Sequence, residues 1–397
     1  MNAGRKIRYG MIGGGEGAFI GAVHRMAAAL DGEYELVCGA FSSDAERNRR
    51  SAAGLGLDSA RAYATLEEML SAEAALPEGR RMEVLAIVTP NHLHAPAAIA
   101  ALDAGFHVFS EKPMAMNLEE ALAIEAAVER SGRLYGLAFT YSGYPLVEEA
   151  RERVARGDFG AIRLVQTEYW QGWLSQAIDR DGQKQAEWRT DPARAGLGGC
   201  LGDIGTHAFQ LAEHVSGLRV EAVSADLTIH VPGRRLDDDV AALLRFEGGA
   251  RGVLKATQVA AGEENGLRLR VYGEKGGLEW SQMEPNTLIL RWLDRPAEIV
   301  RTAGPGIDPL TAARQRTPSG HPEGYIEAFA NLYRCFGRAV RGETAPPPSG
   351  GADWFPGISD GMRTMLFVET AIVNDAGDAK WTALSDVLEG RRKASVG

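Results

Sequence analysis

The N-terminal third of the chain alternates between short apolar runs and amphipathic stretches. After a first apolar run that begins at Ile7, the runs typical of strands are 34–40, 84–88, 106–110 and 134–139. The stretches between them carry apolar residues at helical spacing, as at 96–104 and 118–131. Strands that alternate with helices indicate a parallel sheet in an α/β domain. We place this domain at residues 1–140.

The rhythm changes after about residue 145. A helix at 147–156 and a strand at 162–169 lead to a glycine-rich turn and helix at 196–214. Strand-like runs joined by short turns then follow at 220–230, 239–247, 250–258 and 266–272. We read these runs as one antiparallel sheet in a second domain, residues 141–397. Such a sheet buries one face against helices and can offer the other to a partner subunit, so we expect a homo-oligomer.

Length, net charge and the positions of the cysteines limit the classes of function that the chain can have. A length of 397 residues exceeds what one hydrophobic core normally serves, in agreement with two domains. The net charge of -10 argues against nucleic-acid binding, and no run approaches the ~20 apolar residues of a membrane span. The three cysteines, Cys38, Cys200 and Cys335, are far apart, which suggests reduced thiols in a cytoplasmic protein. His92 and His94 have no third ligand nearby in sequence, so we expect no metal.

A glycine-rich turn follows the first strand. The sequence Gly13-Gly14-Gly15-Glu16-Gly17-Ala18 supplies G-x-G-x-x-A between a strand and a helix. Gly13 permits the tight turn, Gly15 lets main-chain amides approach a pyrophosphate, and Ala18 allows close packing of the helix whose N-terminus faces the anion. We expect this segment, including Glu16 and Gly17, to bind a dinucleotide in a Rossmann, doubly wound sheet; the alternative is a purely structural turn.

The end of the second strand lacks the acidic residue that usually accepts the ribose hydroxyls. Phe41, Ser42 and Ser43 stand there instead, with Arg47 a few residues further on. Hydroxyls beside an arginine favour a 2'-phosphate and hence NADP, whereas Asp44 would serve a ribose and keep NAD possible. The predicted cofactor is therefore NAD or NADP.

Two further motifs carry candidate chemistry. Glu111-Lys112-Pro113 ends the fourth strand, at the edge of an α/β sheet where ligands bind, and the proline keeps Lys112 in an extended or turn conformation. Asp203 and His207 are four residues apart, so on a helix they share one face, where a carboxylate can orient an imidazole that acts as a general base. An ordinary Asp–His helical pair is the competing interpretation.

Taken in order, IGGGEGA, TPNHLH at 89–94, EKP at 111–113 and GDIGTH at 202–207 resemble the Gfo/Idh/MocA family, named for glucose-fructose oxidoreductase and inositol dehydrogenase. The resemblance covers essentially the whole chain. It implies a Rossmann domain followed by an α/β domain with a large, mostly antiparallel sheet, and a homodimer or homotetramer formed through that sheet.

The same resemblance implies roles for individual residues. Lys112 is expected to touch substrate and nicotinamide ribose, His207 to accept the hydroxyl proton, and Asp203 to orient the substrate. Thr89, Pro90, Asn91 and His94 match the loop that lies along the cofactor, and Glu111 of the EKP motif is also expected to bind the cofactor. One departure is Gln210, which stands where the family often has a second aspartate.

Several residues are candidates for substrate recognition. Tyr141 lies in a segment, 139–145, that resembles the substrate-facing loop of the family. Trp173 and Trp188, with Lys184 and Arg189, suggest a stacking wall beside hydroxyl or anion donors, although tryptophans more often serve the core. His321 lies at a turn that opens a helix. The acidic run 237–239 reads most simply as a solvated turn.

The leading hypothesis is an NAD(P)-dependent dehydrogenase that moves a hydride between the nicotinamide and a secondary alcohol of a sugar, an inositol-like cyclitol or a glycoside. Two alternatives keep the same fold. One is a glycoside hydrolase that acts through transient oxidation with tightly held NAD, and the other is a non-catalytic sensor.

Overall fold

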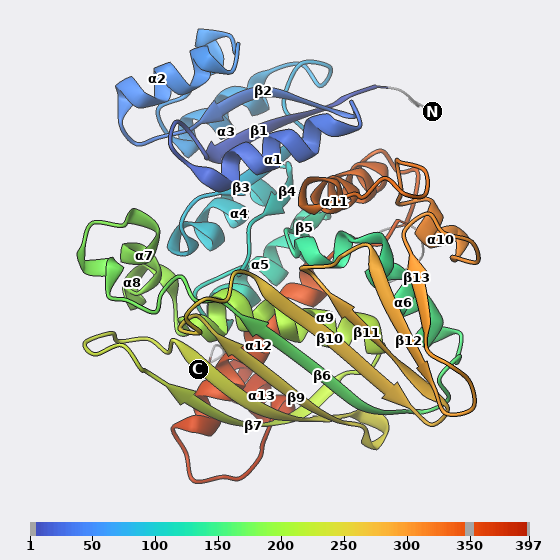
Figure 1. The fold of residues 1–397 in the computed structure, drawn as a ribbon. Helices are drawn as coiled ribbons and strands as arrows, with labels where there is room; N and C mark the ends of the chain where they lie inside the picture. Colours follow the sequence, from blue (N-terminus) through green and yellow to red (C-terminus); the bar gives the residue numbers. More distant parts are fainter. Residues whose placement is uncertain (1–4, 346–352, 395–397) are drawn as a thin grey trace. The chain divides into compact units, whose positions relative to one another are not determined.

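The structure, a computed structural model, describes residues 5–345 and 353–394. The chain forms two compact units (Figure 1). The first unit contains the chain up to Ala115, together with Glu120–Gly143 and Tyr325–Gly361. The second contains Met116–Glu119, Tyr144–Gly324 and the chain from Met362 onward.

The first unit is built on a parallel sheet. Its strands are β1 (Ile7–Gly13), β2 (Tyr34–Ala40), β3 (Val84–Val88), β4 (His107–Ser110) and β5 (Tyr135–Leu137), in the order β2-β1-β3-β4-β5. Every residue of β3 is buried, as expected for a central strand covered on both faces. The parallel Rossmann sheet predicted from the alternating pattern is confirmed.

Helices accompany this sheet, and one of them comes from far along the chain. They are α1 (Phe19–Leu30), α2 (Ala45–Gly54), α3 (Leu66–Ala75), α4 (His94–Asp103), α5 (Leu118–Ser131) and α11 (Tyr325–Val340). Helix α11 packs against α1, and the Leu137 amide donates to the Pro356 carbonyl oxygen at 2.8 Å. The predicted division into 1–140 and 141–397 stays a prediction, and it does not anticipate this return of the chain.

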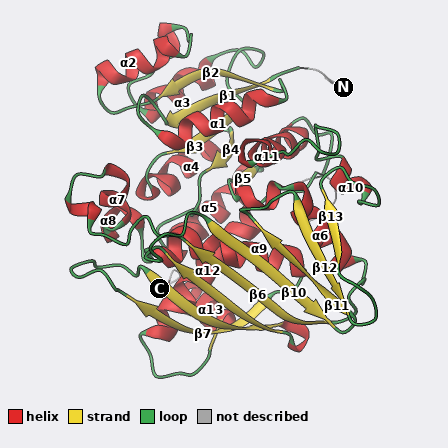
Figure 2. Cartoon of the chain, in the orientation of Figure 1, coloured by secondary structure: helices red, strands yellow, loops and turns green. Residues whose placement is uncertain are grey.

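The second unit contains a nine-stranded sheet (Figure 2). Its strands are β6 (Ile162–Trp170), β7 (Val220–Thr228), β8 (Asp239–Phe246), β9 (Arg251–Thr257), β10 (Gly266–Gly273), β11 (Gly276–Ser281), β12 (Thr287–Trp292), β13 (Glu298–Arg301) and β14 (Thr382–Ala383). The order is β13-β12-β11-β10-β6-β9-β8-β7-β14. The sheet is mostly antiparallel, but β6 and β9 run parallel. The predicted large, mostly antiparallel sheet is therefore confirmed, with β6 inserted between β10 and β9.

Helices cover one face of this sheet. They include α6 (Pro145–Ala155), α9 (Thr206–Ser216), α12 (Ile358–Asp375) and α13 (Leu384–Ala394). The loops of this unit contain three short helices: α7 (Lys184–Arg189), α8 (Pro192–Ala195) and α10 (Pro309–Ala312). Helix α9 packs on β6 and β10, and α6 packs on α9 (Figure 1). Strand β8 alternates buried and exposed residues, as a strand with one covered face should.

Candidate functional site

The glycine loop, residues 13–18, lies where the strand order of the first unit diverges. Gly13 ends β1 and pairs with Val88 of β3, so the loop stands at the carboxyl edge between the two central strands, where open α/β sheets bind ligands. Gly13 has φ +78°, which favours glycine. A Cβ on Gly15 would lie 2.8 Å from the Phe41 carbonyl oxygen. The loop therefore requires its glycines for conformation and for close packing.

The start of α1 fits an anion. Ala18 is the N-cap, its amide donates to the Gly15 carbonyl oxygen at 3.0 Å, and the helix has neither a side-chain cap nor an acid in its first turn. A Cβ on Gly17 would meet no described atom within 4 Å, so there is open space at the loop. Main-chain amides and the helix dipole thus face a region that a pyrophosphate can enter.

The segment after β3 contributes buried polar atoms, and its Thr89 lies beside this loop. The buried Thr89 hydroxyl and the His92 Nδ1 have no hydrogen-bond partner within the described ranges, and the Thr89 methyl group lies 3.1 Å from the Cβ position of Gly13. Buried polar atoms normally have partners, so these two fit a bound group. Pro90 and the buried Asn91 continue the loop.

His94, predicted to belong to the loop along the cofactor, is held by the main chain on both sides. Its ring is 1% exposed, with Nδ1 2.7 Å from the Pro113 carbonyl oxygen and Nε2 2.8 Å from that of Thr89. The ring therefore braces the loop after β3 against the EKP loop, residues 111–113. Both ring nitrogens are engaged with the main chain rather than turned toward a ligand.

The end of β2 is organised by α2. Phe41 is buried in the core beside Gly39, and its amide donates to Asn48 Oδ1 at 2.7 Å. Asp44, the residue considered for ribose, caps α2 by accepting from the Arg47 amide at 2.7 Å. The Phe41 ring thus belongs to the core, and one Asp44 oxygen serves the helix.

The polar residues of this edge point to solvent. Ser43 and the Arg47 side chain are exposed, and Ser42 Oγ accepts from the Asp44 amide at 3.1 Å. The Glu16 amide donates to Ser51 Oγ at 3.0 Å, and its carboxylate pairs with Arg50 at 3.2 Å. Glu16 therefore joins the glycine loop to α2 through both its main chain and its side chain.

The EKP loop follows β4 directly. The Glu111 carboxylate accepts from the Lys112 amide at 3.1 Å and lies 3.0 Å from His24 Nε2. The glutamate thereby fixes the main chain that carries the predicted lysine. Lys112 and the whole dinucleotide loop belong to the first unit.

The Asp203 segment, residues 198–207, is the centre of the candidate site in the second unit. Residues Leu201–Gly205 form a π-helical turn that continues into α9 at Thr206, so the regular α-helix expected under Asp203 and His207 is wrong for its first half. Such turns occur frequently at functional sites. A Cβ on Gly199 would lie 2.2 Å from the Asp237 carbonyl oxygen, so this close approach requires glycine.

Two donors from distant parts of the unit converge on Asp203. Its Oδ2 accepts from Gln258 Nε2 at 2.9 Å and lies 3.4 Å from Arg189 Nε. His207 is 7% exposed, and its ring lies 6.2 Å from that of Tyr169. A carboxylate held by an amide and a guanidinium is oriented and favoured in its charged form.

The tryptophans predicted for substrate binding surround Arg189. Its guanidinium stands 4.2 Å from the Trp188 ring centroid and 6.0 Å from that of Trp173. Gln185 Oε1 accepts from both Trp188 Nε1, at 3.2 Å, and Arg189 Nη1, at 2.5 Å. Both tryptophans are partly exposed, whereas the side chain of Lys184 lies outside the described part of the structure.

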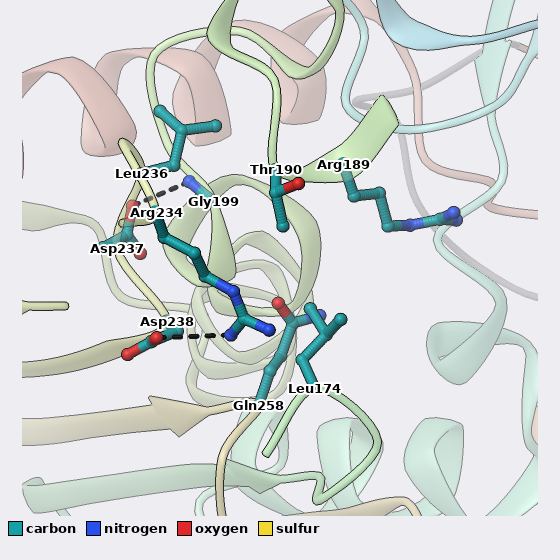
Figure 3. Close-up of a pocket in the computed structure, with 9 residues that line it drawn as sticks. All are labelled: Leu174, Arg189, Thr190, Gly199, Arg234, Leu236, Asp237, Asp238 and Gln258. Atoms are coloured by element: carbon teal, nitrogen blue, oxygen red, sulfur yellow. Dashed lines mark hydrogen bonds and ion pairs between the residues drawn. The ribbon is translucent and has the colours of Figure 1, made fainter. Parts of the chain in front are cut away.

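The acidic run 237–239 is not a solvated turn, and that prediction is wrong. Asp237 and Asp238 are 8% and 2% exposed. Asp237 accepts from the Gly199 amide (Figure 3) and from the Leu201 amide, at 2.7 Å each, which ties it to the start of the Asp203 segment. Burial raises the pKa of Asp237 to about 6 against the opposing effect of these hydrogen bonds. Partners from other segments explain how these carboxylates are buried.

Asp238 completes this arrangement through an arginine. It accepts from the His230 and Val231 amides at 2.8 and 3.0 Å and pairs with the buried Arg234 at 3.3 Å. Arg234 also contacts Asp179 at 3.1 Å. A small pocket of about 210 Å³, which includes open solvent, adjoins these groups (Figure 3). It is lined by Leu174, Arg189, Thr190, Gly199, Arg234, Leu236, Asp237, Asp238 and Gln258.

The remaining predicted residues lie in different surroundings. Tyr141 is buried in the first unit, with its ring 6.4 Å from that of Tyr325. Gln210 is 4% exposed on α9, and its Nε2 has no hydrogen-bond partner among the residues described. His321 lies in an exposed turn, where Nδ1 is 3.2 Å from the Pro318 carbonyl oxygen. The structure therefore does not join His321 to the contacts of Asp203.

Within the described ranges the structure offers neither a metal cluster nor a membrane-spanning helix. No group of three or more His, Cys, Asp or Glu side chains there is arranged to hold a metal ion. No described helix combines the length and apolarity that crossing a bilayer requires.

Sequence reasoning missed Gln258, Asp237 and Arg234 as parts of this site. Gln258 follows β9 with nothing around it to distinguish it from any polar strand end. The only available signal for Asp237 was three consecutive acids, which is more typical of solvent. The contacts that bring these residues into the site join segments far apart in sequence, so no local pattern marks them.

Two family models and a sequence relative match large parts of this chain. The model of the oxidoreductase family with an NAD-binding Rossmann fold matches residues 7–139, and that of the GFO/IDH/MocA C-terminal domain matches residues 147–279. An uncharacterized oxidoreductase of Bacillus subtilis (strain 168) is 32% identical over 85% of this chain and 86% of its own length. The chain belongs to the Gfo/Idh/MocA family.

One solved structure and one further sequence relative match almost the whole chain. An inositol dehydrogenase homologue from Azotobacter vinelandii in complex with NAD+ has a TM-score of 0.91 and 33% identity, covering 96% of this chain and 98% of that one. A levoglucosan dehydrogenase from Pseudarthrobacter phenanthrenivorans is 27% identical over 96% of this chain and 99% of its own length. The protein is thus an oxidoreductase with an NAD-binding Rossmann domain, which confirms the predicted family, fold class and nicotinamide cofactor.

Proposed function

We propose that the protein catalyses reversible hydride transfer between NAD(P) and a secondary alcohol of a sugar, cyclitol or glycoside. The observation that carries this proposal is the Asp203 carboxylate, fixed by Gln258 and Arg189 on the segment that also bears His207. Such an arrangement suits the orientation of a hydroxyl group and the removal of its proton. The NAD-binding domain would bind the nicotinamide cofactor that exchanges the hydride with this alcohol.

The proposed mechanism assigns one task to each of three side chains. When bound, the nicotinamide supplies the hydride acceptor or donor. Asp203 accepts a hydrogen bond from a substrate hydroxyl, and its ion pair with Arg189 favours the ionised form that this requires. His207 Nε2 or Nδ1 takes the hydroxyl proton, and the Lys112 ammonium donates hydrogen bonds to substrate and cofactor. General-base catalysis of this kind typically contributes ~10²–10⁴-fold in rate.

The proposed substrate class follows from the surroundings of Asp203 and from the relatives. Trp173 and Trp188 offer partly exposed aromatic faces beside Arg189, a combination that suits the apolar face and the hydroxyl groups of a ring-shaped polyol. A levoglucosan dehydrogenase has been solved with NADH and levoglucosan, with a TM-score of 0.79 and 26% identity. An inositol dehydrogenase homologue has been solved with NADH and myo-inositol. Both ligands are cyclic polyols.

The proposal is tested by steady-state assays with myo-inositol, levoglucosan, free hexoses and pentoses, and glycosides, each with NAD+ and with NADP+. We expect reduced nicotinamide to form with at least one cyclic polyol, and His207→Ala to lower kcat by ~10²–10⁴-fold. His230→Ala, in an exposed loop, is the matched control and should retain activity. A panel without turnover, despite measurable cofactor binding, contradicts the proposal. The ratio of kcat/KM for the two cofactors decides between NAD and NADP.

We also propose a homodimer or homotetramer formed through the open face of the nine-stranded sheet. Leu164, Leu243 and Val253 are about half exposed, and Leu243 pairs directly with Val253 on neighbouring strands. Neighbouring apolar side chains on a sheet face favour association. Light scattering of wild type and Leu243→Glu tests this: we expect a dimer or tetramer that the charge dissociates, and a monomeric wild type contradicts it.

A further inference from the structure

An imidazole lies deep in the core of the first unit. His24 of α1 is 0% exposed, and the rings of Phe329, Phe109 and Tyr333 stand 4.6, 6.0 and 5.8 Å from its own. Burying a polar group among aromatic rings is costly unless it is hydrogen-bonded. Both nitrogens have partners: Nδ1 lies 2.6 Å from the Tyr333 hydroxyl and Nε2 lies 3.0 Å from Glu111 Oε1.

The direction of these hydrogen bonds follows from the protonation of the partners. Burial raises the pKa of Tyr333 well above its ordinary value, so the phenol keeps its proton. Burial acts to raise the pKa of Glu111 as well, but that pKa is lowered overall, with the hydrogen bond from His24, the charge of Lys112 and the hydrogen bond from the Lys112 amide all acting against burial. A carboxylate only accepts, so Nε2 donates to Glu111 and Nδ1 accepts from Tyr333. This assignment of the tautomer rests on the network.

The other carboxylate oxygen reaches the predicted catalytic lysine. Glu111 Oε2 accepts from the Lys112 amide at 3.1 Å. Tyr333, His24 and Glu111 thus form a chain of directed hydrogen bonds that ends at the main chain of Lys112. The chain joins the helix that begins at the glycine loop, the end of β4 and helix α11.

We infer that His24 is a positioning residue for Lys112 and acts through Glu111. Without its donor, the Glu111 carboxylate is left buried with an unmet hydrogen bond and turns to other partners, which shifts the peptide that carries Lys112. His24 touches no reacting atom in this account. The inference rests on the proposed function, because it assumes that Lys112 acts in hydride transfer.

A double-mutant experiment separates positioning from packing. In the wild type, His24→Phe fills the space without donating and should lower kcat by ~10–100-fold, whereas His24→Gln retains a donor and should recover most of the loss. In a Lys112→Arg background, His24→Phe should cause little further loss, because the two residues act in series. His107→Phe, at the opposite end of β4, is the matched control: it should lower the melting temperature and leave kcat unchanged.

The outcomes distinguish this inference from the function on which it rests. Equal fold-losses from His24→Phe in both backgrounds, or a normal kcat in folded His24→Phe, overturns the inference alone. A normal kcat in Lys112→Ala overturns the proposed role of the lysine and the inference with it. If His24→Phe does not fold, Glu111→Gln replaces it in the same two backgrounds. We then expect kcat to fall in the wild type and to change little in the Lys112→Arg background.

Discussion

The glycine loop and the Asp203 segment both lead into a helix, but the first is built mainly from main-chain groups and the second from side chains. The loop consists of main-chain amides, a helix N-terminus and glycines that lie within six positions of one another in sequence. The Asp203 segment depends on side chains from Arg189, Asp237 and Gln258, which come from three other segments.

This difference determines how each region should respond to substitution. A main-chain site fails when space or conformation is removed, because no side chain makes the essential contact. A side-chain site weakens step by step as individual hydrogen bonds are lost. The predictions below test that contrast, beginning with the largest expected effect.

Gly15→Ala should strongly weaken cofactor binding. Its Cβ would stand 2.8 Å from the Phe41 carbonyl oxygen and 2.8 Å from Ser51 Oγ, so the loop must move away from the position that receives the pyrophosphate. We expect a loss of NAD+ affinity of ~1000-fold, or ~4 kcal/mol, by titration calorimetry. Gly54→Ala, whose Cβ would meet no described atom within 4 Å, should bind normally. Retained affinity in Gly15→Ala would show that the loop does not hold the cofactor.

Asp237→Asn should change how stability depends on pH. The folded pKa of Asp237, about 6, exceeds the ordinary value of 3.8 for this side chain, so between these values the folded state binds more protons than the unfolded state. Stability supplied by the protonated form is complete below the lower value and is lost as pH rises through the higher one. From about pH 4 to about pH 7 the wild type should therefore lose ~3 kcal/mol relative to Asp237→Asn.

Denaturant unfolding across that pH range measures the difference. Asp294→Asn, at an exposed loop position, is the matched control and should follow the wild type at every pH. Parallel curves for the wild type and Asp237→Asn would mean that Asp237 does not titrate in this range, and that the buried acid is not part of a pH-sensitive support for the Asp203 segment.

Gln258→Leu should have the smallest of these effects. It removes one hydrogen bond to Asp203 and leaves the Arg189 contact in place, so we expect kcat/KM to fall ~10-fold, which corresponds to ~1.4 kcal/mol. Gln166→Leu makes the same substitution on neighbouring β6 and is the control, which should leave kcat/KM unchanged. A loss as large as that of His207→Ala would indicate that Gln258 contacts the substrate itself.

The contrast also explains what the sequence could predict. The parallel sheet was predictable because β3 is wholly apolar and helices with regular periodicity separate the strands. The glycine loop was predictable because its contacts are local. The return of α11 to the first unit was not, because its contact with α1 joins residues about 300 positions apart and no periodicity records it.

The side-chain site was predictable only in part. Asp203 and His207 share a local spacing, so the pair could be identified, but the π-helical turn beneath Asp203 leaves no simple pattern. The acidic run 237–239 was misread because burial depends on the amides of Gly199 and Leu201 and on partners such as Arg234, which the run itself does not reveal. The assignment of His94 to the cofactor loop stays a prediction, and the contacts of its ring with the Thr89 and Pro113 carbonyl oxygens could not be read from the sequence.

The most direct test of the proposed reaction follows the hydride itself. A cyclic polyol that turns over in the panel is prepared with deuterium at its carbinol carbon and incubated with the wild-type enzyme and the oxidised cofactor. Mass spectrometry of the reduced nicotinamide should find one deuterium transferred per molecule formed, and His207→Ala should slow its appearance without changing the label. Reduced cofactor that contains no deuterium would contradict hydride transfer from the alcohol carbon.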